Sequence, residues 1–286
     1  MQSENPNVID SPASYFTQPP VATSFSSRLG RKLFGLMLTL QGLGAFALIT
    51  LGVLLTKFGA ARQVMRPRVR EEIARSGLKL LPMFLFIAAA LGFLVIGQSV
   101  AALQRVGAIG YFGKIMVVVV VRELGPLATA LLVLARRGTA NVVELGTARA
   151  LGEVEALEAL SIDPVHYLVV PRVIGLALSV FCLTVYLILG AVVSGYLWAF
   201  LQNISLTPGV YFLQLAGALS WMDFALLALK TCAFGFIIAI VTCYHGLARP
   251  IRLNEVSYAT VRAVAQGVIA CVAIDALFIV IYLVAS

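Results

Sequence analysis

Four ionisable residues interrupt long apolar segments of this chain: Arg122, Glu123, Lys230 and Asp275. A charge near the centre of a bilayer costs at least about 2.5–3.5 kcal/mol to insert, so such side chains face protein or water. Arg122 and Glu123 are adjacent and point about 100° apart on a helix, so each needs a partner on another helix. Pairing Lys230 with Glu123 and Asp275 with Arg122 would neutralise the set, although the sequence does not choose the pairing. The four charges either join helices as ion pairs or line the path of an amphiphile, contacting its head group or exchanging partners as a cavity opens.

The composition places these charges in a membrane. Of the 286 residues, 60% are hydrophobic and 12% are charged, and the mean hydropathy is +0.98. A soluble domain of this size needs far more polar surface. The net charge of +8 does not indicate a nucleic-acid partner, because no nucleic-acid-binding motif accompanies it. Many of the basic residues instead flank apolar segments, as at cytoplasmic membrane borders.

The hydropathy pattern predicts an all-α integral membrane protein with five transmembrane helices. A crossing needs roughly 20 apolar residues, and five segments satisfy this, at about 80–104, 115–135, 168–200, 224–245 and 263–285. A sixth, 33–56, has basic residues at both ends, which predicts an interfacial or re-entrant elbow helix with a bend near Gly42 or Gly44. The predicted organisation is a disordered Ser- and Pro-rich tail over 1–27, the elbow helix with a basic cytoplasmic segment over 28–79, and the membrane domain over 80–286.

Gly125 and Pro126 follow the first charged pair inside the third apolar segment. Proline removes one backbone donor and bends a helix. We therefore predict a bend at these two residues, beside a cavity.

The segment 144–163 is acidic and amphipathic, and it carries a net charge of −4 in a basic chain. Pro164 ends the predicted helix. Because the cytoplasmic leaflet is itself anionic, the acidity favours a partner subunit over the membrane surface as the contact of this helix. The residues expected to contact the partner are Glu144, Arg149, Glu153, Glu155, Leu157, Glu158 and Asp163.

Two stretches carry a family resemblance. The stretch RELGPLATALLVLARRGTANVVELGTARALGEVEALEALSIDPVHYLVVPRV resembles the central signature of the MlaE/YrbE family, and KTCAFGFIIAIVTCYHG at 230–246 resembles a second family motif. With Asp275, the resemblance covers roughly residues 80–285. The chain departs from many relatives at ARPIRLNEVS, where they carry a glycine-rich segment.

The resemblance implies a permease subunit of an ABC transporter for lipids, expected to be phospholipids, in the bacterial inner membrane. Its implied partners are a separate ATPase that receives 144–163 as a coupling helix, an MCE-domain protein, membrane lipids and a second copy of the chain. It also implies a link to outer-membrane asymmetry. The chain has no G-x-x-x-x-G-K-[ST] motif for ATP phosphates. We expect no catalytic residues, no cofactor and no metal site.

Two other functions fit parts of the pattern. A secondary transporter or channel could use the four charges as an ion or proton relay, but we find no internal repeat of the kind that such transporters carry. A membrane scaffold without transport would explain the acidic helix but would leave the buried charges unused. A stoichiometric ATPase that co-purifies with the chain separates the first function from the other two.

Overall fold

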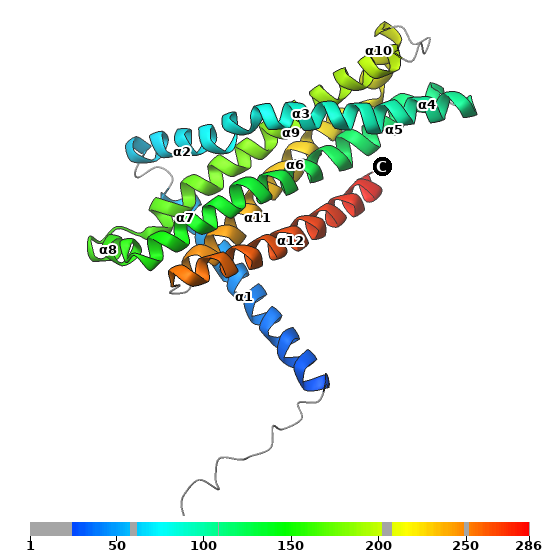
Figure 1. Ribbon diagram of the computed structural model, residues 1–286. Helices are drawn as coiled ribbons and strands as arrows, with labels where there is room; N and C mark the ends of the chain where they lie inside the picture. The colour runs from blue at the N-terminus through cyan, green and yellow to red at the C-terminus, as the bar shows by residue number, and fades with distance from the viewer. Residues whose placement is uncertain (1–24, 58–61, 108, 202–207, 249–251, 286) are drawn as a thin grey trace, which may run out of the picture. The chain divides into compact units, whose positions relative to one another are not determined.

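The computed structural model describes residues 25–57, 62–107, 109–201, 208–248 and 252–285 (Figure 1). The chain divides into two compact units, residues 1–44 and 45–286. The predicted tail, 1–27, lies outside the described residues except for its last three, which begin helix α1 (Phe25–Lys57). The remainder of this section concerns the second unit.

All regular structure in the described ranges is helical, and five helical runs are long and apolar enough to cross a membrane. Each has at least 27 residues, against the roughly 20 that a crossing needs. The prediction of an all-α membrane protein with five spans is therefore confirmed. The runs are Met65–Val106, Phe112–Ala150, Val165–Leu201, Trp221–Leu247 and Leu253–Val284.

Several of these runs switch between α-helix, 3-10 helix and π-helix along their length. The first consists of α2 (Arg62–Ser76), a short 3-10 turn, α3 (Leu81–Leu91), a π-helical segment (Gly92–Ile96) and α4 (Gly97–Val106). The α- and π-helices that follow are α5 (Phe112–Met116), η5 (π-helix, Val117–Leu124), α6 (Gly125–Val133), η6 (π-helix, Leu134–Gly138), α7 (Thr139–Ala150), α8 (Glu153–Ala159), η7 (π-helix, Val165–Val169), α9 (Val170–Leu201), α10 (Pro208–Ala218), α11 (Trp221–Leu247) and α12 (Val256–Ala285).

Helices α9 and α11 form the centre of the bundle. Helix α9 packs against α2, α3, α6 and α11, while α11 also contacts α7 and α12 (Figure 1). The approach of α9 to α11 depends on Gly235, because a Cβ atom added there would lie 2.4 Å from Cα of Ala177 and 2.7 Å from the carbonyl oxygen of Leu176. These are backbone atoms, so the contact cannot be relieved by a side-chain rotation.

We expect Gly235→Ala to destabilise the bundle by about 1–3 kcal/mol, because overpacking forces two central helices apart. Gly217→Ala on α10 is the matched control, since nothing lies within 4 Å of a Cβ atom built there. The midpoint of thermal unfolding in detergent should fall for the first variant and should not fall for the second, where alanine is the better helix former. Equal midpoints for the two variants would contradict the close packing of α9 and α11.

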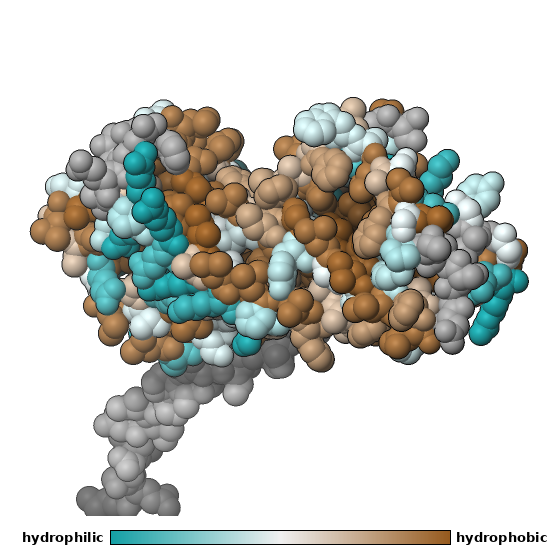
Figure 2. Space-filling model, turned by 90° about the horizontal axis from the view of Figure 1, so that it is seen from above, coloured by the Kyte–Doolittle hydropathy of each residue, from teal (hydrophilic) through white to brown (hydrophobic). Residues whose placement is uncertain are grey.

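The surface of the bundle has the pattern of a membrane protein. In Figure 2 hydrophobic residues cover most of the face, and hydrophilic residues gather toward its left part and at its right edge. Large apolar side chains are more than half exposed on helices throughout the bundle, including Leu94, Leu189, Leu229 and Leu277. An apolar surface of this extent needs lipid to cover it.

The segment predicted as an elbow is part of α1. Its apolar portion, Gln41–Thr56, is shorter than the five spans, and Phe46 packs edge-on against Tyr244 of α11 with ring centroids 5.9 Å apart. Helix α1 continues without a break through Gly42 and Gly44, so the structure contains no re-entrant turn at these glycines. The position of this helix in the membrane interface stays a prediction.

A further helix lies between the third and fourth spans, where the sequence analysis predicted no element. This is α10, whose Tyr211 is buried against Phe112, with ring centroids 5.2 Å apart. The Tyr211 hydroxyl donates a hydrogen bond to the carbonyl oxygen of Val192, at 3.0 Å. The contact ties α10 to both α5 and α9.

Candidate functional site

Lys230 is the centre of a group of charges inside the bundle. It lies on α11, its side chain is 0% exposed, and its Nζ is 2.7 Å from Oδ1 of Asp275 and 3.1 Å from Oε2 of Glu123. It also donates to the carbonyl oxygen of Arg122 at 2.8 Å. Two of its N–H donors therefore form hydrogen bonds, to the Arg122 carbonyl and to Glu123, while the contact with Asp275 is an ion pair.

Pro126 explains why the carbonyl oxygen of Arg122 is free to accept a hydrogen bond from Lys230. In an α-helix the carbonyl of Arg122 would accept from the N–H of residue 126, but proline has no N–H. The preceding backbone is π-helical, and the N–H of Gly125 reaches back to the carbonyl of Val120. The sequence predicted a bend at Gly125 and Pro126; the structure places the change from η5 to α6 at this point.

Arg122 does not pair with Asp275, the second pairing that the sequence offered. Its Nε lies 2.8 Å from Oδ1 of Asp223, which is 2% exposed and also caps the start of α11 together with Ser220. The guanidinium carbon stands 4.9 Å over the ring of Tyr282 on α12. Asp223 and Tyr282 are therefore members of the site that the sequence analysis missed. Asp223 lies two residues after the start of α11, where an acidic residue is typical of an ordinary cap.

We define the Lys230 cluster as Arg122, Glu123, Asp223, Lys230 and Asp275. When all five are ionised, two positive charges face three negative ones and the net charge is −1. Glu123, Lys230 and Asp275 each lie nine to eleven residues from the same end of their runs, which is about 15 Å at 1.5 Å per residue. The structure thus brings together at one depth all four charges that the sequence singled out, and adds Asp223.

A second group of charges joins four helices near the α8 end of the bundle. Nη2 of Arg137 on η6 donates hydrogen bonds to both carboxylate oxygens of Glu72 on α2, each at 3.0 Å. Both residues are more than 90% buried. Nη1 of Arg137 also lies 3.3 Å from Oε1 of Glu144 on α7. Oε2 of the same Glu144 is 3.1 Å from Arg172 on α9. We call these four residues the Arg137 cluster.

Arg137→Ala should destabilise the protein by about 3–5 kcal/mol, because the Glu72 carboxylate would stay buried without a partner. Arg136→Ala is the control, since the neighbouring arginine is exposed. Thermal unfolding in detergent checks both variants. A normal midpoint for Arg137→Ala would contradict a stabilising role for its ion pair with Glu72.

The segment 144–163 is not the single helix that the sequence predicted. Helix α7 ends at Ala150, Gly152 adopts a left-handed conformation with φ of 79°, and a separate seven-residue helix, α8, follows. Glycine adopts such a φ without the strain that a Cβ atom brings. Glu144, one of the predicted contact residues, lies on the far side of this break, within the Arg137 cluster.

The other predicted contact residues surround α8. Glu153, Glu155 and Glu158 are exposed on this helix, and Arg149 at the end of α7 lies 3.3 Å from Glu155. Leu157 is half-buried, and Asp163 accepts a hydrogen bond from the N–H of Val165 at 3.0 Å where η7 begins. Glu153 and Glu158 therefore make no ion pair with the described part of the bundle, whereas Glu155 is tied to α7 through Arg149.

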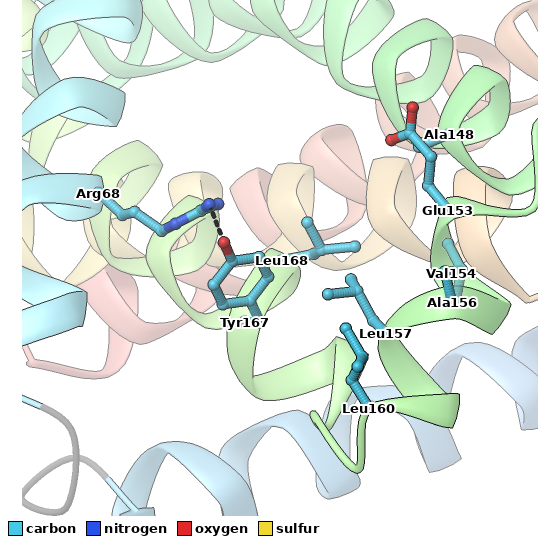
Figure 3. Close-up of a pocket in the computed structure, with 9 residues that line it drawn as sticks. All are labelled: Arg68, Ala148, Glu153, Val154, Ala156, Leu157, Leu160, Tyr167 and Leu168. Carbon is cyan, nitrogen blue, oxygen red and sulfur yellow. Dashed lines mark hydrogen bonds between the residues drawn. The ribbon is translucent and has the colours of Figure 1, made fainter.

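A pocket of about 420 Å³ lies between α8 and α2. Figure 3 shows Leu157, Leu160 and Leu168 beside Tyr167, with Arg68 of α2 reaching the same ring. The Arg68 guanidinium stands 3.7 Å over the Tyr167 ring and hydrogen-bonds its hydroxyl. The arrangement gives the α8 end a concave apolar surface with charged side chains at its rim.

In the described part of the chain, no three His, Cys, Asp or Glu residues gather as they would around a metal ion.

The five apolar helical runs and the charges buried between them are the features of a multi-pass integral membrane protein. The model of the Permease MlaE family matches residues 69–281, and the chain belongs to this family. It is thus a transport permease and not an enzyme. An ABC permease works with a separate ATPase subunit, which hydrolyses the ATP.

Three relatives illustrate the family. A probable ABC transporter permease protein of Rickettsia felis is 29% identical over 237 residues, which are 79% of this chain and 86% of the relative. A probable ABC transporter permease protein of Synechocystis is 32% identical over 213 residues, covering 73% and 79%. The chloroplastic protein TRIGALACTOSYLDIACYLGLYCEROL 1 of Arabidopsis thaliana is 28% identical over 204 residues, covering 70% of this chain and 57% of the relative.

Proposed function

We propose that this permease moves phospholipids in the bacterial inner membrane. Two copies of the chain enclose a lipid-sized cavity, and an ATPase dimer drives the movement from the cytoplasmic side. An MCE-domain protein on the opposite side exchanges lipid with the cavity. In a double-membraned cell this exchange would contribute to the asymmetry of the outer membrane.

The observation that carries the lipid assignment is the Lys230 cluster. A phospholipid combines a charged head group with apolar chains, and its path must therefore offer both kinds of surface at bilayer depth. The cluster supplies partly exposed Arg122 and Glu123 beside helices that are otherwise apolar. The name of the Arabidopsis relative refers to a lipid, which agrees with this proposal.

The acidic surface of α8 supports the position proposed for the ATPase. The helix has three exposed carboxylates and no lysine or arginine, so its surface is complementary to a basic groove. The basic residues of α2 and Arg136 lie toward the same end of the bundle, which the positive-inside rule assigns to the cytoplasm. The opposite end, with α10, then faces the MCE partner.

Purification of the full chain from bacterial membranes in a mild detergent tests this function. We expect an ATPase to co-purify at a 1:1 ratio of chains, and phospholipid to be present in the complex by mass spectrometry. Hydrolysis of ATP should respond to added phospholipid. A chain that purifies without an ATPase, or a complex that binds no phospholipid and whose hydrolysis ignores it, would contradict the proposal.

A further inference from the structure

Glu144 joins two arginines that lie on different spans. Its Oε1 is 3.3 Å from Nη1 of Arg137 on η6, and its Oε2 is 3.1 Å from Nη2 of Arg172 near the start of α9. Arg137 has a second carboxylate partner, since its Nη2 donates to both oxygens of Glu72. Among the described residues, Arg172 has Glu144 as its one anionic partner. The Glu144 bridge is therefore an ionic link between the second and third spans.

This bridge closes the segment that carries α8. Glu144 lies on α7 and Arg172 near the start of α9, so α8 and η7 fall between them in the chain. Nη1 of Arg172 also donates a hydrogen bond to the carbonyl oxygen of Leu168 on η7, at 2.9 Å. Leu168 lines the pocket beside Leu157 of α8 (Figure 3). Direct contacts thus lead from Glu144 through Arg172 and Leu168 to the side chains of α8.

Helix α8 depends on its neighbours for its position. It has only seven residues, and so short a helix is not stable by itself. Val154 is buried, with 1% of its surface exposed, and Glu155 pairs with Arg149 at the end of α7. An exposed ion pair of this kind contributes little. The fixed ends of the connection, at Glu144 and Arg172, are therefore needed to hold α8 in one orientation.

We infer that Glu144 is a positioning residue that couples α8 to α9 through Arg172. Movement of the ATPase on α8 is passed across this bridge to α9, which packs against α3 and α11 at the centre of the bundle. The inference rests on the proposed function and adds the route by which the ATPase acts. It also replaces the role of direct ATPase contact that the sequence predicted for Glu144, because both carboxylate oxygens already face arginines.

Glu144→Gln tests the inference in the intact complex of permease and ATPase, reconstituted in phospholipid vesicles. The variant keeps the shape of the side chain and removes its charge, while the buried pair of Arg137 with Glu72 stays in place. The ATPase should co-purify at the wild-type ratio. We expect ATP hydrolysis to stay within about twofold of the wild type, whereas the lipid moved per ATP hydrolysed should fall about tenfold.

A double-mutant cycle shows whether Glu144 acts through Arg172. Arg172→Gln should lower the lipid moved per ATP as much as Glu144→Gln does, because each substitution breaks the same link. The two together should lower it no further than either alone, since residues that act as one unit are not additive. Glu71→Gln is the control and should keep the wild-type value, because Glu71 is exposed on α2 and pairs with Arg75.

Four results would overturn the inference. The first is an unchanged yield of lipid per ATP in Glu144→Gln, and the second is additive losses in the double variant. The third is loss of the ATPase from Glu144→Gln at a wild-type unfolding midpoint, which would make Glu144 a direct contact. The fourth is a lowered midpoint with hydrolysis and lipid movement reduced equally, which would make its role one of folding alone. A wild-type chain without ATPase or lipid movement would instead contradict the proposed function.

Discussion

Replacing Lys230 with alanine will destabilise the bundle by about 3–5 kcal/mol, the typical cost of leaving the partner of a buried ion pair uncompensated. The substitution removes the cation that pairs with two carboxylates. It also removes the donor to the Arg122 carbonyl, which Pro126 already deprives of its helical donor. The midpoint of thermal unfolding in detergent should fall well below that of the wild type. ATP-driven lipid movement should be lost with it.

Neutral variants of the cluster separate stability from transport. Glu123→Gln combined with Lys230→Met should recover only part of the lost stability, because Asp275 then lies buried with no lysine beside it. Adding Asp275→Asn should recover more. If the charges serve only to join helices, the stable triple variant will move lipid normally; if they contact the head group, it will stay slow. Normal stability and normal transport in the single Lys230→Ala variant would contradict both roles.

Reversing two charges on α8, Glu153→Lys with Glu158→Lys, should uncouple the permease from its ATPase without unfolding the membrane bundle. Both residues are exposed and make no ion pair within the described residues, so the membrane bundle loses no ion pair when they change. The acidic surface, however, becomes basic and repels a basic partner. The ratio of ATPase to permease after purification should fall at least about tenfold, a change of about 1.4 kcal/mol in binding.

Glu71→Lys is the control for this reversal, since Glu71 is another exposed acidic residue, on α2. The unfolding midpoint of the double variant should match that of the wild type. An ATPase that still co-purifies at the wild-type ratio, and whose hydrolysis still responds to lipid, would show that α8 is not the contact.

The parts of the fold that depend on hydropathy could be predicted from the sequence. A bilayer requires about 20 apolar residues per crossing, so the five spans follow from composition along the chain. The gathering of Arg122, Glu123, Lys230 and Asp275 also follows, because the membrane leaves buried charges few alternatives to one another. The pair between Lys230 and Glu123 is the one contact that this reasoning identified.

Features that depend on the rotation of helices could not be predicted. Asp223 in the first turn of α11 pairs with Arg122 on the π-helical η5, and the sequence spacing indicates neither the π-helix nor the place where α11 begins. Gly152 divides the acidic segment although an amphipathic pattern continues across it. Glu144 likewise resembles its exposed acidic neighbours in sequence, yet its contacts with Arg137 and Arg172 place it in an internal cluster.

The most direct test of the account is ATP-driven lipid movement by the complete complex. Permease, ATPase and the proposed MCE-domain partner are reconstituted in vesicles with a fluorescent phospholipid. Transfer between the membrane and the MCE-domain protein is followed with ATP or with a non-hydrolysable analogue. We predict transfer that depends on hydrolysis in the wild type and is lost in Glu153→Lys with Glu158→Lys. Transfer at the same rate with the analogue, or none in a complex that hydrolyses ATP normally, would contradict the assignment of this chain as a lipid permease.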